Sequence, residues 1–140
     1  MPKTARQQRM IAIALVLWNA VGVAMWALQS STSPETLAQG DEVQIEVWRA
    51  MPLWAWIAYA VASWSGLLGA VALLLQRRVA VWLFAASIVG IVAQFSYALV
   101  LSPLVQAKGP GVIAFPVVIL VIALGSMAYA HAAAGRDLLS

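Results

Sequence analysis

The 140-residue sequence contains no cysteine, and only 9% of its residues are charged. The absence of cysteine excludes disulfide bonds, thiolate catalysis and metal sites with cysteine ligands. Soluble domains of this size carry roughly 25% charged residues, which cover their surface toward water. Because 64% of the residues are hydrophobic, this chain has too few charges to cover a soluble fold. A bilayer accepts apolar surface directly, so the composition predicts an integral membrane protein.

Charged residues are also absent from four long apolar stretches. These stretches cover residues 10–28, 53–75, 79–101 and 112–130. A helix of ~20 residues crosses the ~30 Å hydrocarbon core, so each stretch is long enough to span it. A single charge at the centre of a span would oppose insertion by roughly 2.5–3.5 kcal/mol. The sequence therefore predicts an all-α fold, a four-helix transmembrane bundle that forms a single domain over residues 1–140.

Lysine and arginine are distributed unevenly around these stretches. Six of the eight precede the first span, join the second to the third, or follow the fourth: Lys3, Arg6, Arg9, Arg77, Arg78 and Arg136. Only Arg49 and Lys108 lie in the other two connections. Because positive residues concentrate on the cytoplasmic side, we expect both termini to be cytoplasmic. The first apolar run exceeds a usual signal-peptide core, so we expect it to be retained as a span.

The connection between the first two spans carries most of the acidic residues: Glu35, Asp41, Glu42 and Glu46. Ser33 followed by Pro34 predicts the start of one short helix, and Asp41 predicts the start of a second. The second piece has an apolar stripe at helical spacing, formed by Val43, Val47, Ala50 and Met51. We expect a short amphipathic outer segment, either a plain connector or a helix that docks a partner.

The second and third spans are joined by only three residues, so they should form an antiparallel hairpin. Small residues recur every four positions in both spans. The predicted packing residues are Ala62, Gly66, Gly69, Ala70, Ala86 and Gly90. Rows of this kind let helix backbones approach closely in lipid. They predict helix packing, either within this chain or against another.

Polar side chains inside the spans have two interpretations. The residues concerned are Asn19, Tyr59, Ser87, Gln94 and Ser126. They can form hydrogen bonds between helices, or they can line a candidate polar seam for a small hydroxylated solute. The spans lack a carboxylate with which to couple transport to an ion, so any passage would be passive. Trp18 and Trp64 also lie near mid-membrane, where an indole needs either a partner or a lipid-facing position.

Pro116 lies in the fourth predicted span and cannot donate to the carbonyl of Val112, which predicts a static kink or a hinge. His131 is the only histidine and sits at the end of that span, where it favours an interaction with the helix terminus over a ligand role. The sequence contains no acid–base pair, activated nucleophile or phosphate loop. We therefore expect no catalytic site, no metal and no cofactor, and the lack of a basic cluster with aromatics argues against nucleic acid.

Several short motifs follow one another along most of the chain. They are Leu17-Trp18-Asn19 with Gly22, Met51-Pro52-Leu53-Trp54, the run from Gly66 to Arg78, and Leu83 to Ser87 with Gln94. With these motifs the chain resembles a group of small four-span bacterial inner-membrane proteins of uncharacterised function. Some members carry the loose label "sugar transporter", but this sequence lacks the Pro-Gln pair of small sugar facilitators. The resemblance implies the architecture and a bacterial inner membrane.

Together these features predict a non-catalytic integral inner-membrane protein that acts through helix–helix contacts, most simply as an accessory or structural subunit of a larger membrane complex. The alternative is a passive facilitator or transporter-like protein for a small polar solute such as a sugar. In either case the expected partners are membrane lipids, other membrane-protein subunits and further copies of this chain.

Overall fold

The computed structural model describes residues 3–102, 104–136 and 139–140. The regular elements in these ranges are all helical: α1 (Lys3–Ser31), α2 (Pro34–Leu37), α3 (Glu42–Arg49), α4 (Leu53–Leu74), α5 (Val79–Ser96), the π-helical η1 (Tyr97–Leu101), α6 (Leu104–Lys108), the 3-10 helical η2 (Pro110–Ile113) and α7 (Ala114–Gly135). Four segments are long and apolar enough to span a membrane: Arg6–Ser31, Leu53–Leu74, Val79–Leu101 and Pro110–Gly135. The prediction of an all-helical fold with four helices that can span a membrane is confirmed for the described residues.

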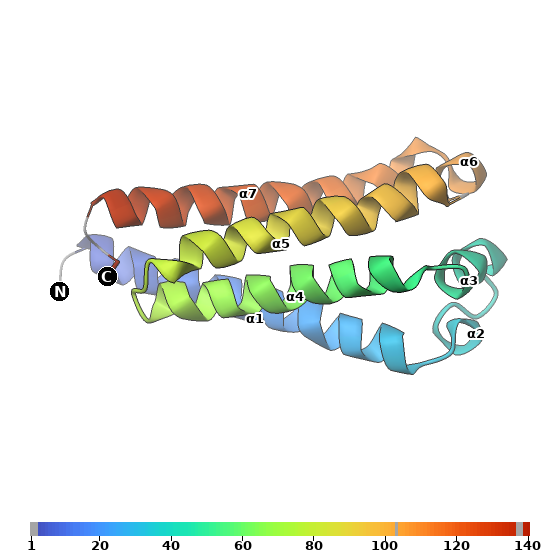
Figure 1. Ribbon diagram of the computed structural model, residues 1–140, viewed down its shortest axis with the longest axis horizontal. Helices are drawn as coiled ribbons and strands as arrows, with labels where there is room; N and C mark the ends of the chain where they lie inside the picture. Colours follow the sequence, from blue (N-terminus) through green and yellow to red (C-terminus); the bar gives the residue numbers. More distant parts are fainter. Residues whose placement is uncertain (1–2, 103, 137–138) are drawn as a thin grey trace.

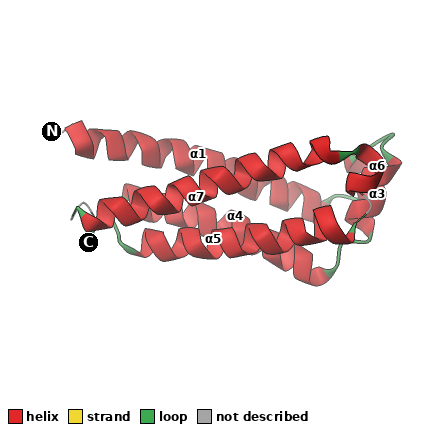
Figure 2. Ribbon diagram, turned by 90° about the horizontal axis from the view of Figure 1, so that it is seen from above, coloured by secondary structure: helices red, strands yellow, loops and turns green. Residues whose placement is uncertain are grey.

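Figure 1 shows the long helices side by side, with both chain ends at one end of the molecule. We call this the terminus-bearing end. The short helices α2, α3 and α6 lie at the opposite end, which we call the capped end (Figures 1 and 2). Since the spans cross the hydrocarbon between them, the two ends lie at opposite faces of the membrane.

Helix α4 lies at the centre of the packing. It contacts α1 and α5, and α5 in turn contacts α7. The buried face of α4 consists mostly of small residues, among them Ala55, Ala62, Gly66 and Ala70. Small side chains let helices approach closely in lipid, where no water is expelled to drive association. They therefore place α4 in the interior, whereas α1 and α7 turn most of their side chains outward.

The turn between α4 and α5 begins with a Schellman motif. Gln76 adopts the left-handed conformation, with a φ of 61°. The amide of Arg77 then donates to Ala72 O at 2.8 Å, and the amide of Gln76 donates to Leu73 O at 3.0 Å. These bonds satisfy carbonyl groups at the helix end that would otherwise lack donors. The chain can therefore reverse at once, and α5 starts at Val79 and runs back along α4.

The acidic outer segment forms two short helices. Pro34 is the first residue of α2, and Ser33 precedes it as the N-cap. Asp41 is the N-cap of α3, and its carboxylate accepts a hydrogen bond from the Gln44 amide at 3.1 Å. Both helices start where the capping residues predicted.

One member of the predicted apolar stripe is misplaced. Val47 and Met51 are buried and Val43 packs beside them, but Ala50 is exposed. Ala50 keeps the helical conformation and its amide donates to Glu46 O, but it lies at the edge of the stripe, which is centred on Val43, Val47 and Met51 at a spacing of four residues. The observed apolar stripe therefore consists of Val43, Val47 and Met51.

The ends of two spans also differ from the sequence prediction. Helix α1 extends beyond residues 10–28 in both directions. The fourth span starts as the 3-10 helix Pro110–Ile113 and becomes α-helical only at Ala114. Pro116 therefore lies in the first turn of α7, where a missing amide costs no intrahelical hydrogen bond. It does not interrupt the interior of the span, and a hinge at this residue stays a prediction.

Candidate functional site

The interior brings two of the predicted polar residues together. Asn19 of α1 and Ser87 of α5 meet beside Gly66 of α4. A Cβ atom on Gly66 would overlap the Asn19 carboxamide and lie 3.2 Å from Ser87 Oγ. Gly66 thus provides the space in which three helices converge. We call these residues the polar junction.

The side chains of the polar junction donate their hydrogen bonds within the protein. Ser87 Oγ donates to Ala62 O at 2.7 Å, which ties α5 to α4. Asn19 Nδ2 donates to Leu15 O, one turn earlier in α1, at 2.8 Å. A donor without an acceptor is costly inside hydrocarbon, and both donors avoid that cost here. The arrangement is typical of hydrogen-bonded helix packing.

The other candidates for the polar seam lie apart from the junction. Ser126 Oγ donates to Ile122 O of its own helix at 2.7 Å. Tyr59 stacks on Trp56, with ring centroids 6.1 Å apart. Gln94 is half-buried, and within the described residues its carboxamide forms no hydrogen bond. Among the described residues, the five predicted positions therefore form no continuous hydrogen-bonded path.

The predicted small residues lie where α4 meets its neighbours. A Cβ atom on Gly90 would lie 2.7 Å from both Ala58 O and Ala62 N, closer than real side chains approach. One on Gly69 would lie 2.9 Å from the ring of Phe84. The remaining members are buried or half-buried on the same two helices: Ala62, Gly66, Ala70 and Ala86. The packing partner of these rows is therefore found within this chain.

Six further glycines, among them Gly22 and Gly125, behave differently. Positions for a Cβ atom on Gly22 of α1 and Gly125 of α7 have no atom of a packing neighbour within 4 Å. Gly125 is exposed, and so are Ala128 and Ala132, which follow it at the spacing of one helix face. We call these three residues the outer α7 row. These residues give the outer face of α7 a row of small side chains, which its small-residue spacing in the sequence could have revealed.

The mid-span tryptophans occupy the surface of the bundle. Trp18 is 40% exposed and Trp64 is 44% exposed. Trp64 also meets Trp26 edge to face, with ring centroids 6.3 Å apart. Both mid-span indoles therefore take the lipid-facing position that sequence analysis left as one alternative.

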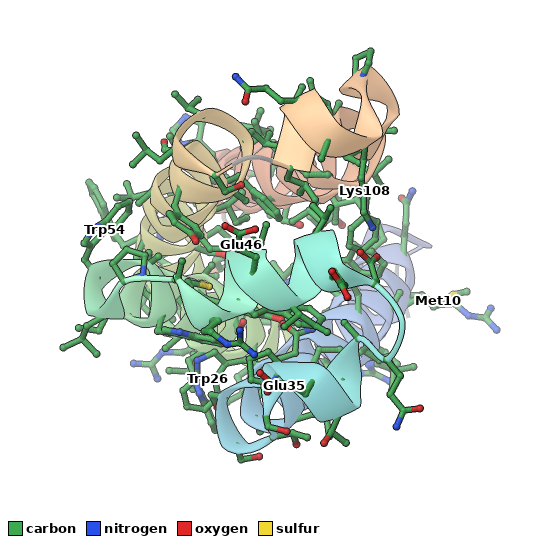
Figure 3. The ribbon with its side chains drawn as sticks, turned by 90° about the vertical axis from the view of Figure 1, so that its right-hand side faces the viewer. Met10, Trp26, Glu35, Glu46, Trp54 and Lys108 are labelled. Carbon is green, nitrogen blue, oxygen red and sulfur yellow. The ribbon has the colours of Figure 1, made fainter. Side chains whose placement is uncertain are left out.

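At the capped end, α3 lies across the ends of the long helices (Figure 3). Tyr97 is 6% exposed, and its hydroxyl donates to Val47 O at 2.7 Å. Met51 and Ala55 pack in the same buried cluster. Because a buried phenol needs an acceptor, this hydrogen bond anchors α3 to η1.

Ion pairs join the capping helices. Lys108 of α6 pairs with Asp41 at the start of α3, and Arg49 pairs with Glu35 of α2. Figure 3 shows Lys108 extending from α6 toward α3. The hydrogen bond from Lys108, with a smaller contribution from the Gln44 amide, lowers the pKa of Asp41 from its usual value of 3.8. Both pairs are partly exposed to solvent, so each contributes little alone.

The last two residues return to the turn between α4 and α5. The Ser140 amide donates to Gln76 O at 2.8 Å, and the Arg78 amide donates to Ser140 O at 2.9 Å. Leu139 is 3% exposed and packs in the same cluster as Phe84. No pattern in the sequence predicts this return, because it depends on contacts between distant residues.

Two hollows open at the terminus-bearing end. The first, of about 220 Å³, is lined by Gln8, Arg9, Leu73, Leu74, Leu75 and Gln76. The second, of about 310 Å³, is lined by Arg78, Val81, Trp82, His131, Ala134 and Gly135. Within the described part of the chain, no cluster of three acidic or histidine side chains is placed to bind a metal. Sequence analysis did not identify Gln8 or Gln76.

Comparisons with protein-family models, with curated proteins and with solved structures found no match to this chain. The resemblance to small four-span bacterial proteins therefore stays an expectation from the sequence motifs.

Proposed function

We propose that the protein is a non-catalytic integral inner-membrane protein that acts through helix–helix contacts, as an accessory or structural subunit of a larger membrane complex. The outer α7 row carries this proposal, because a Cβ atom on Gly125 would meet no packing neighbour within 4 Å in the described chain. Small residues on an outward face let a second helix approach closely in lipid. The rows on α4 and α5, by contrast, are already occupied within the protein.

The hydrogen bonds of the interior support a static bundle. Ser87 uses its hydroxyl to hold α5 against α4, and Asn19 and Ser126 each donate to their own helix. Polar groups that are satisfied in this way stabilise a packed interior. A subunit that offers its outer faces to a partner needs such a stable interior.

The proposed orientation places both termini in the cytoplasm and the capped end outside. Six of the eight lysines and arginines belong to the terminus-bearing end, and Arg49 and Lys108 belong to the capped end. Cytoplasmic segments carry an excess of these residues. A bacterial inner membrane is the location that this orientation and the sequence motifs favour.

The test is extraction of the protein from its native membrane in mild detergent, followed by mass spectrometry of what co-purifies. The affinity tag belongs before Met1, because Leu139 is buried and a tag after Ser140 would disturb it. We expect a larger polypeptide at a fixed ratio, and we expect Gly125→Leu to reduce that ratio. A protein that emerges alone, or only with copies of itself, contradicts the subunit proposal.

A passive facilitator for a small polar solute is the second candidate. It is favoured by Gln94, whose half-buried carboxamide forms no hydrogen bond within the described residues. If a solute follows the polar seam, Asn19→Leu and Gln94→Leu should abolish flux of a small sugar into liposomes while the bundle still assembles. If these side chains only pack helices, the unmodified protein should show no flux above empty liposomes.

A further inference from the structure

The hollow between the start of α1 and the end of α4 contains a polar group that lacks a partner. Gln8 lines this hollow and is 2% exposed. Its Nε2 donates to Leu73 O at 3.4 Å, and its Oε1 is buried with no donor among the described residues. A buried acceptor without a donor is rare in native proteins and calls for a ligand, a water or an ion.

The depth of this hollow matches the boundary between hydrocarbon and headgroups. Gln8 lies two residues before Met10, where the charge-free stretch of α1 begins, and Gln76 directly follows Leu75, where that of α4 ends. Met10 points away from the helices into the surroundings (Figure 3), and Leu75 is also exposed. The hollow therefore opens toward the region in which a phospholipid places its phosphate and glycerol groups.

The charge around the hollow selects an anion. Arg9 lines it, and within the described residues no carboxylate pairs with that guanidinium. The exposed arginines Arg6, Arg77 and Arg136 belong to the same end of the molecule. Arginine binds phosphate through well-placed donors, and a cluster of positive charge disfavours a headgroup that carries its own ammonium.

We propose that this hollow binds the headgroup of an anionic phospholipid that carries hydroxyl groups, of the phosphatidylglycerol type. Arg9 pairs with the phosphate, and Gln8 Oε1 accepts a hydrogen bond from a headgroup hydroxyl. Gln76 offers a second polar contact, and the exposed Leu74 and Leu75 meet the acyl chains. A soluble phosphate ester would share the polar contacts but would leave these leucines unused.

The test is lipid binding to the purified full-length protein in detergent, followed by native mass spectrometry. Phosphatidylglycerol, phosphatidylethanolamine and free glycerol phosphate are the probes. We expect the protein to bind phosphatidylglycerol more tightly than the other two. Gln8→Leu should weaken that binding by about five-fold, the loss of one hydrogen bond, whereas Gln7→Leu, its exposed neighbour, should leave it unchanged.

A second pair of variants tests the proposal even if the Gln8→Leu protein does not fold. Arg9→Gln should weaken phosphatidylglycerol binding by about ten-fold, whereas Arg6→Gln, which does not line the hollow, should have a smaller effect. The proposal is overturned if each variant matches its control, or if phosphatidylethanolamine binds as tightly. Displacement of the lipid by free glycerol phosphate at equal concentration would instead assign the hollow to a soluble phosphate ester.

Discussion

Gly90 of α5 lies against the backbone of Ala62 of α4, so closely that a Cβ atom on Gly90 would stand 2.7 Å from the Ala62 amide nitrogen. The same stretch of α4 accepts the hydrogen bond from Ser87, about one turn away from Gly90 along α5. Close backbone approach and a hydrogen bond thus occur together, as expected where lipid offers no hydrophobic driving force. This contact holds the backbones of α4 and α5 close together.

Gly90→Ala should therefore destabilise the protein by about 1–3 kcal/mol, the usual cost of forcing a methyl group into a packed interface. Backbone atoms of α4 cannot move aside as a flexible side chain would. The measurement is the free energy of unfolding in detergent, followed by the loss of helical circular dichroism. The matched control is Gly125→Ala, because a Cβ atom there meets no neighbour within 4 Å. Equal stability of the two variants would contradict the proposed contact.

The ion pair between Asp41 and Lys108 should make the stability of the capped end depend on pH. Because the pKa of Asp41 is lowered from 3.8 in the folded protein, the pair stabilises that state above pH 3.8. The stabilisation is lost as the pH falls through the lower folded value. Asp41→Asn removes this dependence but keeps a residue that can cap α3. Hydrogen exchange of the α3 amides, compared between the two proteins, measures the effect.

The two proteins should differ in exchange at neutral pH and converge in strong acid. Lys108→Met, which removes the other charge, should behave like Asp41→Asn. An equal difference at neutral pH and in strong acid would contradict a stabilisation that depends on the charge of Asp41.

Tyr97→Phe should loosen α3 from the bundle while leaving the spans intact. The change removes the hydrogen bond to Val47 O and leaves a buried carbonyl that has lost this donor. A loss of about 1 kcal/mol corresponds to roughly five-fold faster exchange of the amides in α3. Tyr129→Phe is the control, because Tyr129 lies in the last two turns of α7 and packs against the cluster of Phe84 and Leu139, away from α3. Unchanged exchange in α3 would show that Tyr97 does not hold this helix.

The sequence predicted the spans and the helix starts, because these features depend on neighbouring residues alone. The apolar runs gave the spans because helix length and bilayer thickness must match. Ser33, Pro34 and Asp41 gave the starts of the short helices because capping involves only neighbouring residues. The prediction for Ala50 was wrong because the burial of a residue at the edge of an apolar stripe depends on contacts with other helices.

The remaining features depend on contacts between residues far apart in the chain. Gln8 looks like a surface residue at the start of a helix, and only the packing of α1 against α4 buries it. No local pattern predicts that Ser140 pairs with Gln76, or that the Leu139 carbonyl accepts a hydrogen bond from Arg78 Nε. The small residues were recognised as packing residues, yet only the folded arrangement distinguishes Gly90, which packs inside, from Gly125, which faces outward.

The most direct test of contact through the outer face of α7 is cross-linking in native membranes. The chain contains no cysteine, so a single cysteine at position 125 can carry a benzophenone label. Position 89 is the control, because Val89 of α5 is also outward-facing, at 68% exposure. If α7 docks a partner, position 125 should yield one cross-linked product with a distinct polypeptide, and position 89 should yield only lipid adducts. Equal and diffuse cross-linking from both positions would show that lipid covers α7, and would contradict the proposed function.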